Sequence, residues 1–496
     1  MVIVTVNGTE QIKCNKGDNL YQVLTAAGHV FAGNCGMKGR CNRCLIWNQD
    51  TGSFVKSCQY IVDKDISIRL EEEQLTGITG HKMNPPIEQI IASYKTENET
   101  GRTEQTERNE KVSKADGEVS DRKRTPAYGI AIDIGTTTIG MELVDLNEKK
   151  VKSSFSTFNS QIAVGADVVA RIRAAGTKEG LKQLRSLLFT DIQKGVDHML
   201  INTPEAVDHI RRYVLAGNAT MLSIAEGLTT ENLFGYPFTL KNPDVRVIAQ
   251  DDFIASPSFE SASSDVICLP NIAAFSGADI AAGAAAAELD RDSSYRMLID
   301  LGTNGEILLC NKEQGVAASA ACGSAFEGCF RAANVFGSNI FDMLALLLKR
   351  GQMNADGVLA EPYFESGISM GSNMKIDMET IRAFQLGKSA ILSGILMLVK
   401  EIGIELSDIS EVCIAGGFGF HLNLSNAVTL GLFPQSFQGK MKVLGNTSLE
   451  GAYLSLIEPG FIDTINRFKE KIRYVDLSNR SDFNTVYIEH LPFRTY

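Results

Sequence analysis

The sequence predicts an α/β protein made of two folded parts with a linker between them, and three observations support this organisation. Short alternating strands around an Asn7-Gly8 turn open the chain, and a long stretch without aromatic residues follows. Strands and helices separated by Gly-rich turns then fill the rest. We therefore expect a small domain over residues 1–94, a flexible linker over 95–125 and a large domain over 126–496.

Length, charge and composition narrow the class of protein. A chain of 496 residues suggests roughly three units of domain size. Its formal net charge of −11 argues against a nucleic-acid-binding protein, which would have a basic surface stripe. The first residues lack the features of a signal peptide, and apolar stretches such as Ile280 to Ala287 are shorter than the ~20 residues that cross a bilayer. Ten cysteines are too few for a disulfide scaffold in a chain of this length. We expect a cytoplasmic protein that binds neither nucleic acid nor a membrane.

The N-terminal domain has the pattern of a small mixed sheet packed on one helix. The Asn7-Gly8 turn separates two alternating strands, and Asp18-Asn19 can cap a short helix with Leu20, Val23 and Leu24 on one face. The predicted elements are strands at 2–6, 11–14, 45–47 and 66–70 and a helix at 20–27. This arrangement predicts a ubiquitin-like β-grasp fold.

Four cysteines interrupt that domain with the spacing Cys-x5-Cys-x2-Cys-x13-Cys: Cys35, Cys41, Cys44 and Cys58. Three close thiolates and one distant one are similar to the pattern of plant-type [2Fe–2S] ferredoxins, although the first gap is longer and the last is shorter. Zinc is the alternative, but structural zinc usually uses two Cys-x2-Cys pairs and only one is present. Unligated thiols are the third reading. The spacing favours a [2Fe–2S] cluster.

The segment 95–125 has no aromatic residue, and Val112 and Val119 are its only large aliphatic residues. Such a composition buries too little apolar surface to offset its ordering entropy. We expect a flexible tether, with a solvated helix as the alternative.

The large domain contains an internal repeat. Asp133-Ile-Gly-Thr-Thr-Thr recurs as Asp300-Leu-Gly-Thr-Asn-Gly, and Val214-Leu-Ala-Gly recurs as Cys413-Ile-Ala-Gly. Both pairs follow the same order at similar offsets. The repeat predicts two related halves that face a cleft.

The two repeated turns have residues suited to phosphate binding. Glycine lets main-chain N–H groups approach phosphate oxygens, hydroxyl and amide side chains add donors, and aspartate can hold Mg²⁺ through water. Asp133 and Asp300 are therefore the predicted catalytic residues that position magnesium. The predicted phosphate-binding residues are Gly135, Thr136, Thr137, Thr138, Gly302, Thr303, Asn304 and Gly305.

Later positions complete the predicted nucleotide site. Gly416 and Gly417, followed by Phe418, let the backbone pass flat against adenosine. Lys388, on the polar face of a predicted helix, can reach the sugar or base; an exposed helix lysine is the alternative. Asp279 is the further catalytic carboxylate that we place near the γ-phosphate, and its alternative role is to cap a helix.

This set of motifs resembles the superfamily of acetate and sugar kinases, heat-shock chaperones and actin (the ASKHA superfamily). The resemblance implies ATP with Mg²⁺ bound in a cleft between two related halves.

The cysteine loop, the tether and the twin hairpins in one chain are similar to the reductive activators of corrinoid proteins. Further stretches that carry this resemblance are Gly165-Ala-Asp-Val-Val-Ala-Arg-Ile, Gly217-Asn-Ala-Thr-Met, Leu269-Pro-Asn-Ile-Ala-Ala-Phe, Ala325-Phe-Glu-Gly and Gly445-Asn-Thr-Ser-Leu-Glu-Gly-Ala. The family is a group of iron–sulfur ATPases that restore methyltransferases whose cobalamin has been oxidised to Co(II). The resemblance implies a corrinoid protein of a methyltransferase system as partner and an unidentified low-potential electron donor. It also implies a homodimer formed through the ATPase domain. Electron transfer would then run uphill, because the potential of a plant-type cluster is about −400 mV.

Some stretches depart from the family pattern. Larger relatives have an extra domain between ferredoxin and ATPase parts, and the family's Gly-Pro-Ala-Phe-Glu-Gly reads Gly323-Ser-Ala-Phe-Glu-Gly here. The family's Cys-Gly-Ser-Gly-Leu-Ile-Asp reads Phe336-Gly-Ser-Asn-Ile-Phe-Asp. If the corrinoid docks on the ATPase domain, Ser319 or Ser324 can approach cobalt.

Two other functions fit parts of the sequence. One is an activator of 2-hydroxyacyl-CoA dehydratases, a class that resembles a dimer with a bridging [4Fe–4S] cluster and no ferredoxin domain. The other is a redox-sensing binding module that uses ATP only as a switch. The four N-terminal cysteines argue against the first, and a turnover assay with a Co(II) corrinoid protein separates both from reductive activation.

Overall fold

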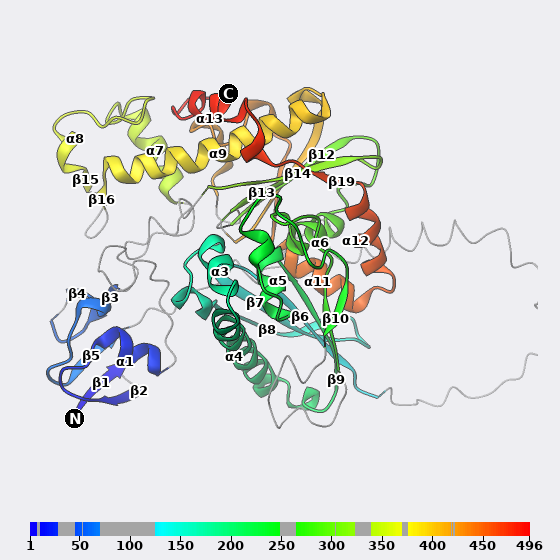
Figure 1. The fold of residues 1–496 in the computed structure, drawn as a ribbon. Coiled ribbons are helices and arrows are strands. Elements are labelled where there is room, and N and C mark those ends of the chain that lie inside the picture. Colours follow the sequence, from blue (N-terminus) through cyan, green and yellow to red (C-terminus); the bar gives the residue numbers. More distant parts are fainter. Residues whose placement is uncertain are drawn as a thin grey trace, which may run out of the picture.

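The computed structural model describes residues 1–6, 10–27, 45–51, 53–69, 125–248, 264–302, 304–322, 339–369, 375–417, 419 and 422–496 (Figure 1). Most of the predicted linker and three of the four clustered cysteines lie outside these residues.

The N-terminal part is a mixed five-stranded sheet in the order β2-β1-β5-β3-β4. Its elements are β1 (Val2–Val6), β2 (Glu10–Cys14), α1 (Leu20–Ala26), β3 (Leu45–Asn48), β4 (Ser53–Lys56), a 3-10 turn (Ser57–Gln59) and β5 (Ile66–Arg69). β1 pairs antiparallel with β2 and parallel with β5, and Leu20 and Leu24 of α1 are fully buried in the same core as Val4 and Ile68. The strand pattern and the apolar helix face thus give the sheet on one helix that the sequence predicts. β4 was missing from the prediction.

The first half of the large domain is a six-stranded sheet in the order β10-β11-β9-β6-β7-β8. Its strands are β6 (Tyr128–Ile134), β7 (Thr138–Asp145), β8 (Lys150–Phe158), β9 (Ile210–Gly217), β10 (Arg246–Ile248) and β11 (Asp265–Cys268). Its helices are α3 (Val168–Ala175), α4 (Lys178–Asn202), α5 (Ala219–Ala225) and α6 (Ala278–Ala286). Central strands such as β6 are apolar on both faces, as expected for a sheet covered on both sides.

The second half is a six-stranded sheet in the order β18-β17-β12-β13-β14-β19, in which the first five strands repeat the topology of β11-β9-β6-β7-β8 and β19 is added at the other edge. Its strands are β12 (Tyr295–Leu301), β13 (Gly305–Cys310), β14 (Gly315–Ala320), β17 (Ile409–Ala415), β18 (Met441–Gly445) and β19 (Ile472–Tyr474), with a small hairpin of β15 (Ile368–Ser369) and β16 (Lys375–Ile376). Its helices are α7 (Asn339–Lys349), α8 (Tyr363–Ser366), α9 (Met378–Ile402), α10 (Leu424–Thr429), α11 (Thr447–Ile457), α12 (Phe461–Glu470) and α13 (Phe483–Glu489).

The strand register shows that the two halves are equivalent. Asp133 at the end of β6 pairs with Ala216 on the parallel strand β9, and Asp300 at the end of β12 pairs with Ala415 on the parallel strand β17. An antiparallel meander follows each aspartate-bearing strand. The sequence repeat is therefore a structural duplication.

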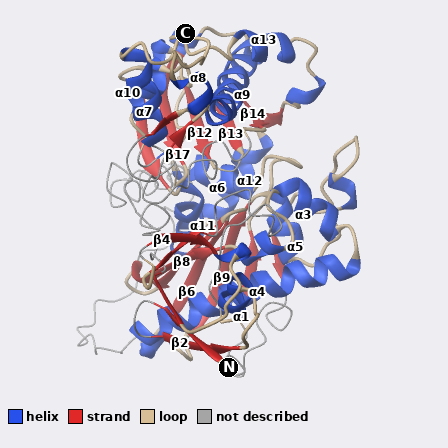
Figure 2. Cartoon of the chain, turned by 90° about the vertical axis from the view of Figure 1, so that its left-hand side faces the viewer, coloured by secondary structure: helices blue, strands red, loops and turns tan. Residues whose placement is uncertain are grey.

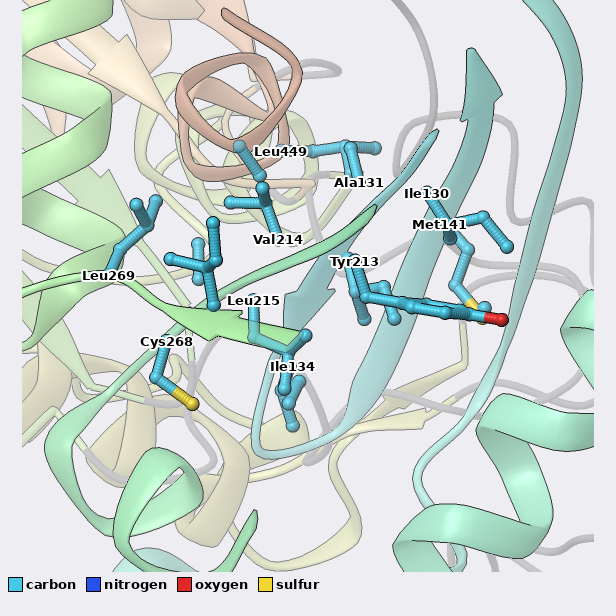
Figure 3. Packing of buried hydrophobic residues seen from close by; sticks show 14 of the residues in the cluster. Ile130, Ala131, Ile134, Met141, Tyr213, Val214, Leu215, Cys268, Leu269 and Leu449 are labelled. Carbon is cyan, nitrogen blue, oxygen red and sulfur yellow. The ribbon is translucent and has the colours of Figure 1, made fainter. Parts of the chain in front are cut away.

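Helices α6 and α11 join the halves and lie between the two sheets in Figure 2. α11 follows β18 of the second half, yet it packs on the first sheet, where Leu449 lies beside Ala131 and Val214 (Figure 3). α6 and α11 touch at glycines: a Cβ on Gly283 would lie 2.5 Å from Thr447 Oγ1, and one on Gly451 would lie 2.6 Å from Ala282 Cβ. Backbone-to-backbone packing of this kind needs glycine.

One described helix, α9, is long and apolar enough to cross a membrane by length and composition. However, 78% of its most apolar window is buried inside the protein, in the core of the second half. This burial accounts for its apolar character.

Candidate nucleotide-binding site

Asp133 lies at the end of β6 and is held from the other half of the sequence. Its Oδ2 accepts a hydrogen bond from Asn446 Nδ2 at 2.9 Å, and its Oδ1 accepts one from Ser448 Oγ at 2.7 Å. Asn446 caps α11, and Ser448 is in the first turn of that helix. Burial raises the pKa of Asp133, while the two hydrogen bonds lower it in part. The duplicated strand and the connecting helix thus meet at one carboxylate.

Asp279 lies in the first turn of α6, where Gly277 occupies the N-cap position. Asp279 is therefore not the N-cap residue itself, but its carboxylate accepts a first-turn N–H, that of Ile280 at 2.8 Å, so the alternative role at the start of the helix fits the structure as well. Burial raises the pKa of Asp279, and the negative charge of Asp133 raises it further. The structure brings these two predicted carboxylates together.

Asp133 and Asp279 are both half-buried, and two neighbouring carboxylates repel each other unless a proton or a cation is bound between them. Carboxylate oxygen is also the ligand type that Mg²⁺ prefers. The carboxylate oxygens of Asp133 therefore fit a magnesium ion, and the raised pKa of the neighbouring Asp279 fits a group that accepts a proton.

The first hairpin, residues 135–138, is supported from behind by polar side chains. Asn159 Nδ2 donates to the carbonyl of Gly135 at 2.9 Å, Arg171 donates to the carbonyl of Thr136, and Asn218 Nδ2 donates to Thr136 Oγ1 at 3.1 Å. The predicted Thr136 is buried, whereas Thr137 and Thr138 are partly exposed. Sequence reasoning missed all three supporting residues. Two of them, Arg171 and Asn218, lie inside stretches that it had singled out as family motifs.

The second hairpin is supported mainly by close packing. A Cβ on Gly305 would lie 1.8 Å from Ile391 Cδ1 of α9, so this predicted phosphate-binding glycine makes room for a helix. The N–H of Gly302 donates to the carbonyl of Asn304 at 3.1 Å. Thr303 lies outside the described residues.

Gly416 adjoins Asp300 and requires glycine for two reasons. Its φ is +87°, and a Cβ there would lie 2.6 Å from both Asp300 Oδ1 and the carbonyl oxygen of Leu301. The predicted adenosine-binding turn is therefore adjacent to the predicted catalytic aspartate. Gly417 follows it in the described chain, and Phe418 lies outside the described residues.

The structure does not bring the charged group of Lys388 to the hairpins. Its side chain is 1% exposed, and its Nζ donates to the carbonyls of His490 and Pro492 in the C-terminal segment and lies 5.6 Å from the centre of the Phe493 ring. Burial lowers the pKa of Lys388 to about 7. Both interpretations of this residue, a nucleotide contact and an exposed lysine, need correction, because the C-terminal segment covers that face of α9.

The structure describes one of the four predicted cluster ligands, Cys58. Cys35, Cys41 and Cys44 lie outside the described residues, and Cys58 is buried in the 3-10 turn, where its carbonyl accepts from Asn19 Nδ2 at 3.0 Å. No group of three or more His, Cys, Asp or Glu residues is placed to hold a metal within the described part of the chain. Of the two serines suggested near cobalt, Ser319 lies on β14 opposite Glu306 of β13, and Ser324 is outside the described residues.

Comparison with protein families gives two adjoining matches. The RACo middle region matches residues 128–292, and the C-terminal domain of RACo, the ASKHA domain, matches residues 294–333 and 329–495. The chain belongs to the RACo family. The two RACo matches meet between α6 and β12, where the first half of the duplication ends.

Individual relatives support this assignment over the whole chain. The corrinoid activation enzyme RamQ of Eubacterium limosum is 26% identical, with 98% of each chain covered. A [Co(II) methylated amine-specific corrinoid protein] reductase of Methanosarcina barkeri is 22% identical over 74% of this chain and 77% of the relative. Among solved structures, a reductive activator for corrinoid, iron-sulfur protein has a TM-score of 0.69 at 22% identity, with 100% of this chain and 99% of that chain covered. This likeness shows that the two chains share a fold.

Proposed function

We propose that this RACo-family protein is an ATP-dependent reductive activator that transfers one electron to the Co(II) cobalamin of a corrinoid protein in a methyltransferase system and so restores Co(I). The observation that carries the proposal is the full-length similarity to RamQ, a corrinoid activation enzyme. The second curated relative is also a corrinoid protein reductase.

The paired carboxylates support the ATPase part of this proposal. Asp133 and Asp300 occupy equivalent positions at the ends of two duplicated strands and would hold Mg²⁺, directly or through water, between the two hairpins. Asp279, with its raised pKa, would accept a proton from the water that attacks the γ-phosphate. ATP and water would give ADP and phosphate, with Gly416 and Gly417 close to the adenosine.

The four cysteines, Cys35, Cys41, Cys44 and Cys58, would hold the electron carrier. When bound, a [2Fe–2S] cluster supplies one electron at a time, and an external low-potential donor restores it. The composition of residues 95–125 supports a tether that lets the N-terminal domain visit first the donor and then the corrinoid protein. A homodimer through the ATPase domain and a cytoplasmic location complete the proposal.

A reactivation assay tests the function. The full-length protein, purified anaerobically, is mixed with a Co(II) corrinoid protein and a chemical reductant such as titanium(III) citrate, and cobalt absorbance is followed. We expect Co(I) to form only with Mg²⁺ and ATP. Formation at the same rate without ATP, or ATP hydrolysis unaffected by any corrinoid protein, would contradict it.

A cysteine variant tests the cluster. The purified protein should be brown and contain about two irons per chain, as expected from the cluster type. Cys41→Ser should lose iron and keep ATP binding, since the nucleotide site lies in the other domain. Zinc in place of iron would refute the cluster assignment.

Splitting the chain in residues 95–125 tests the tether. The two pieces should keep iron and ATPase activity respectively, and their mixture should reactivate corrinoid only weakly, because the tether supplies an effective concentration of roughly millimolar. A severely shortened linker that works as well as the parent would show that the domain has no need to move.

A further inference from the structure

Arg171 is one of the largest fully buried side chains of the first half and contacts the first hairpin. It is 0% exposed, and its guanidinium donates to the carbonyl of Gly165 at 2.9 Å, to Gln161 Oε1 at 3.1 Å and to the carbonyl of Thr136 at 2.5 Å. The sulfur of Met221 lies 3.2 Å from Nη1. All of these acceptors are uncharged.

The chain is shaped to accommodate this arginine. A Cβ on Gly165 would lie 2.8 Å from the main-chain nitrogen of Arg171 and 2.9 Å from its Cγ, so only glycine fits there. Gln161 is itself fully buried and is fixed by a second hydrogen bond, from its Nε2 to the carbonyl of Leu184 at 3.0 Å. The guanidinium therefore sits in a built, rigid polar site.

Arg171 forms no salt bridge among the residues that the structure describes. The carboxylate of Asp167 acts on Arg171 only through its charge, and it caps α3 through the N–H of Ala170. Burial lowers the pKa of Arg171 to about 9, with Asp167 opposing that shift, and the group is still a cation at neutral pH. Burying a cation without a counter-charge is unfavourable, and an anion bound nearby would offset that cost.

Asn159 and Arg171 contact two successive carbonyls of the first hairpin. In a trans peptide the C=O and N–H point in opposite directions. Because Asn159 binds the carbonyl of Gly135 and Arg171 binds that of Thr136, the N–H groups of the next two residues point away from the supporting side chains. Successive N–H groups turned to one side form an anion-binding concavity. The second hairpin has no buried arginine of this kind among its described neighbours, which include Ile391 and Cys322.

We propose that Arg171 is a positioning residue that fixes the first hairpin for phosphate binding, and that the phosphates of the bound nucleotide balance its buried charge. The inference rests on the proposed function, since it names how that site recognises ATP. The second phosphate source, inorganic phosphate, is a separate arm of the test.

Three variants of the full-length protein separate charge from structure. Arg171→Gln removes the charge and keeps donors near Thr136. Arg171→Lys keeps the charge and loses the planar fork. Gln161→Glu keeps the arginine and places a carboxylate 3.1 Å from its Nη1, which neutralises the charge internally, although one glutamate oxygen then faces the carbonyl of Leu184. Arg185→Gln is the control, because Arg185 donates to the carbonyl of Ala225 at the end of α5.

The measurements are calorimetric affinities for Mg²⁺-ATP, Mg²⁺-ADP, adenosine and inorganic phosphate, together with KM and kcat for ATP hydrolysis. We expect Arg171→Gln and Gln161→Glu to weaken ATP binding about 10-fold or more and ADP binding less, with adenosine changed under about 2-fold. KM should rise more than kcat falls. Arg171→Lys should retain most of the preference for ATP over adenosine.

Equal losses for all ligands would show a structural role alone and overturn the proposal. If Arg171→Gln fails to fold, the ATP affinity of Gln161→Glu is the deciding measurement. If Arg171 had only a structural role, pairing it with a glutamate would leave the ATP affinity unchanged. If the parent bound inorganic phosphate as tightly as ATP, the site would be one for free phosphate, and the proposal that it recognises the nucleotide would be overturned. If the parent itself binds no nucleotide, the proposed function fails; if the parent binds ATP and all three variants match it, this inference alone fails.

Discussion

The two hairpins have the same place in a duplicated topology, and different side chains support them. The first is held by hydrogen bonds from Asn159, Arg171 and Asn218 to its backbone and to Thr136. The second depends on space left by glycine, at Gly305 against α9 and at Gly416 against Asp300. The strand pairing at the two aspartates is the same in both halves, whereas the side chains that support the two turns differ. We infer that substitutions in the first half change phosphate recognition and that those in the second half change the position of the turn itself.

The largest effect is expected from the two aspartates. Asp133→Ala and Asp300→Ala should each lower the ATP hydrolysis rate by about 100- to 1,000-fold, because each removes charge from the predicted magnesium site. Steady-state ATPase assays with the cluster absorbance as a control would measure this. A normal rate in either variant would show that the halves do not share the site.

Substitution of Gly416 should lower ATPase activity more than substitution of Gly217, the equivalent glycine of the first half. Gly416→Ala forces a residue at φ +87° and places a Cβ against Asp300, so we expect about 10- to 100-fold lower ATPase activity, from roughly 1–2 kcal/mol of backbone strain and a displaced carboxylate. Gly217→Ala, at φ +157° and 2.8 Å from the carbonyl of Ile134, should have a smaller effect. The reverse order would place the sensitive turn in the first half.

Ser448→Ala tests the link from α11 to Asp133. The lost hydrogen bond normally lowers the pKa of Asp133, so that pKa should rise and activity should fall about 3- to 10-fold at pH 6 and recover as the pH increases. A pH profile of ATP hydrolysis measures the shift. Ser455→Ala is the control, since its hydroxyl bonds within α11 to the carbonyl of Gly451. A profile displaced to lower pH would contradict the assignment.

The smallest effect on activity is expected from Lys388→Met, which should change stability instead. The folded pKa of about 7 lies below the ordinary value of 10.5, so the unfolded chain binds more protons between these values, and parent stability should rise with pH across that window. The slope is at most about 1.4 kcal/mol per pH unit for one proton. Denaturant unfolding at several pH values should show that the free energy of unfolding rises with pH in the parent and in the exposed-site control Lys400→Met. The same rise should be absent in Lys388→Met. Equal slopes in all three proteins would contradict the prediction that Lys388 causes this pH dependence.

These cases also show what the sequence could predict. Local patterns sufficed for four of the five strands of the N-terminal sheet and for the repeat at Asp133 and Asp300, whereas the catalytic role of Asp279 stays a prediction. They failed where the partner is distant in sequence: Arg171 binds a carbonyl 35 residues away, Lys388 binds one 102 residues away, and Ser448 binds an aspartate 315 residues away. No periodicity shows such contacts, because tertiary packing creates them. The cysteine spacing remains a prediction, since three of the four residues lie outside the described structure.

The crossing of α6 and α11 has a mechanical consequence. Both helices start at the carboxylate pair, with Asp279 in the first turn of one and Ser448 in the first turn of the other, and they press backbone to backbone at Gly283 and Gly451. α11 packs on the first sheet, whereas α6 also places Ile280 and Ala284 in the core with strands of the second sheet. A rotation of one half against the other would therefore turn these helices about their contact at the two glycines, and a methyl group at either glycine would push the helices apart.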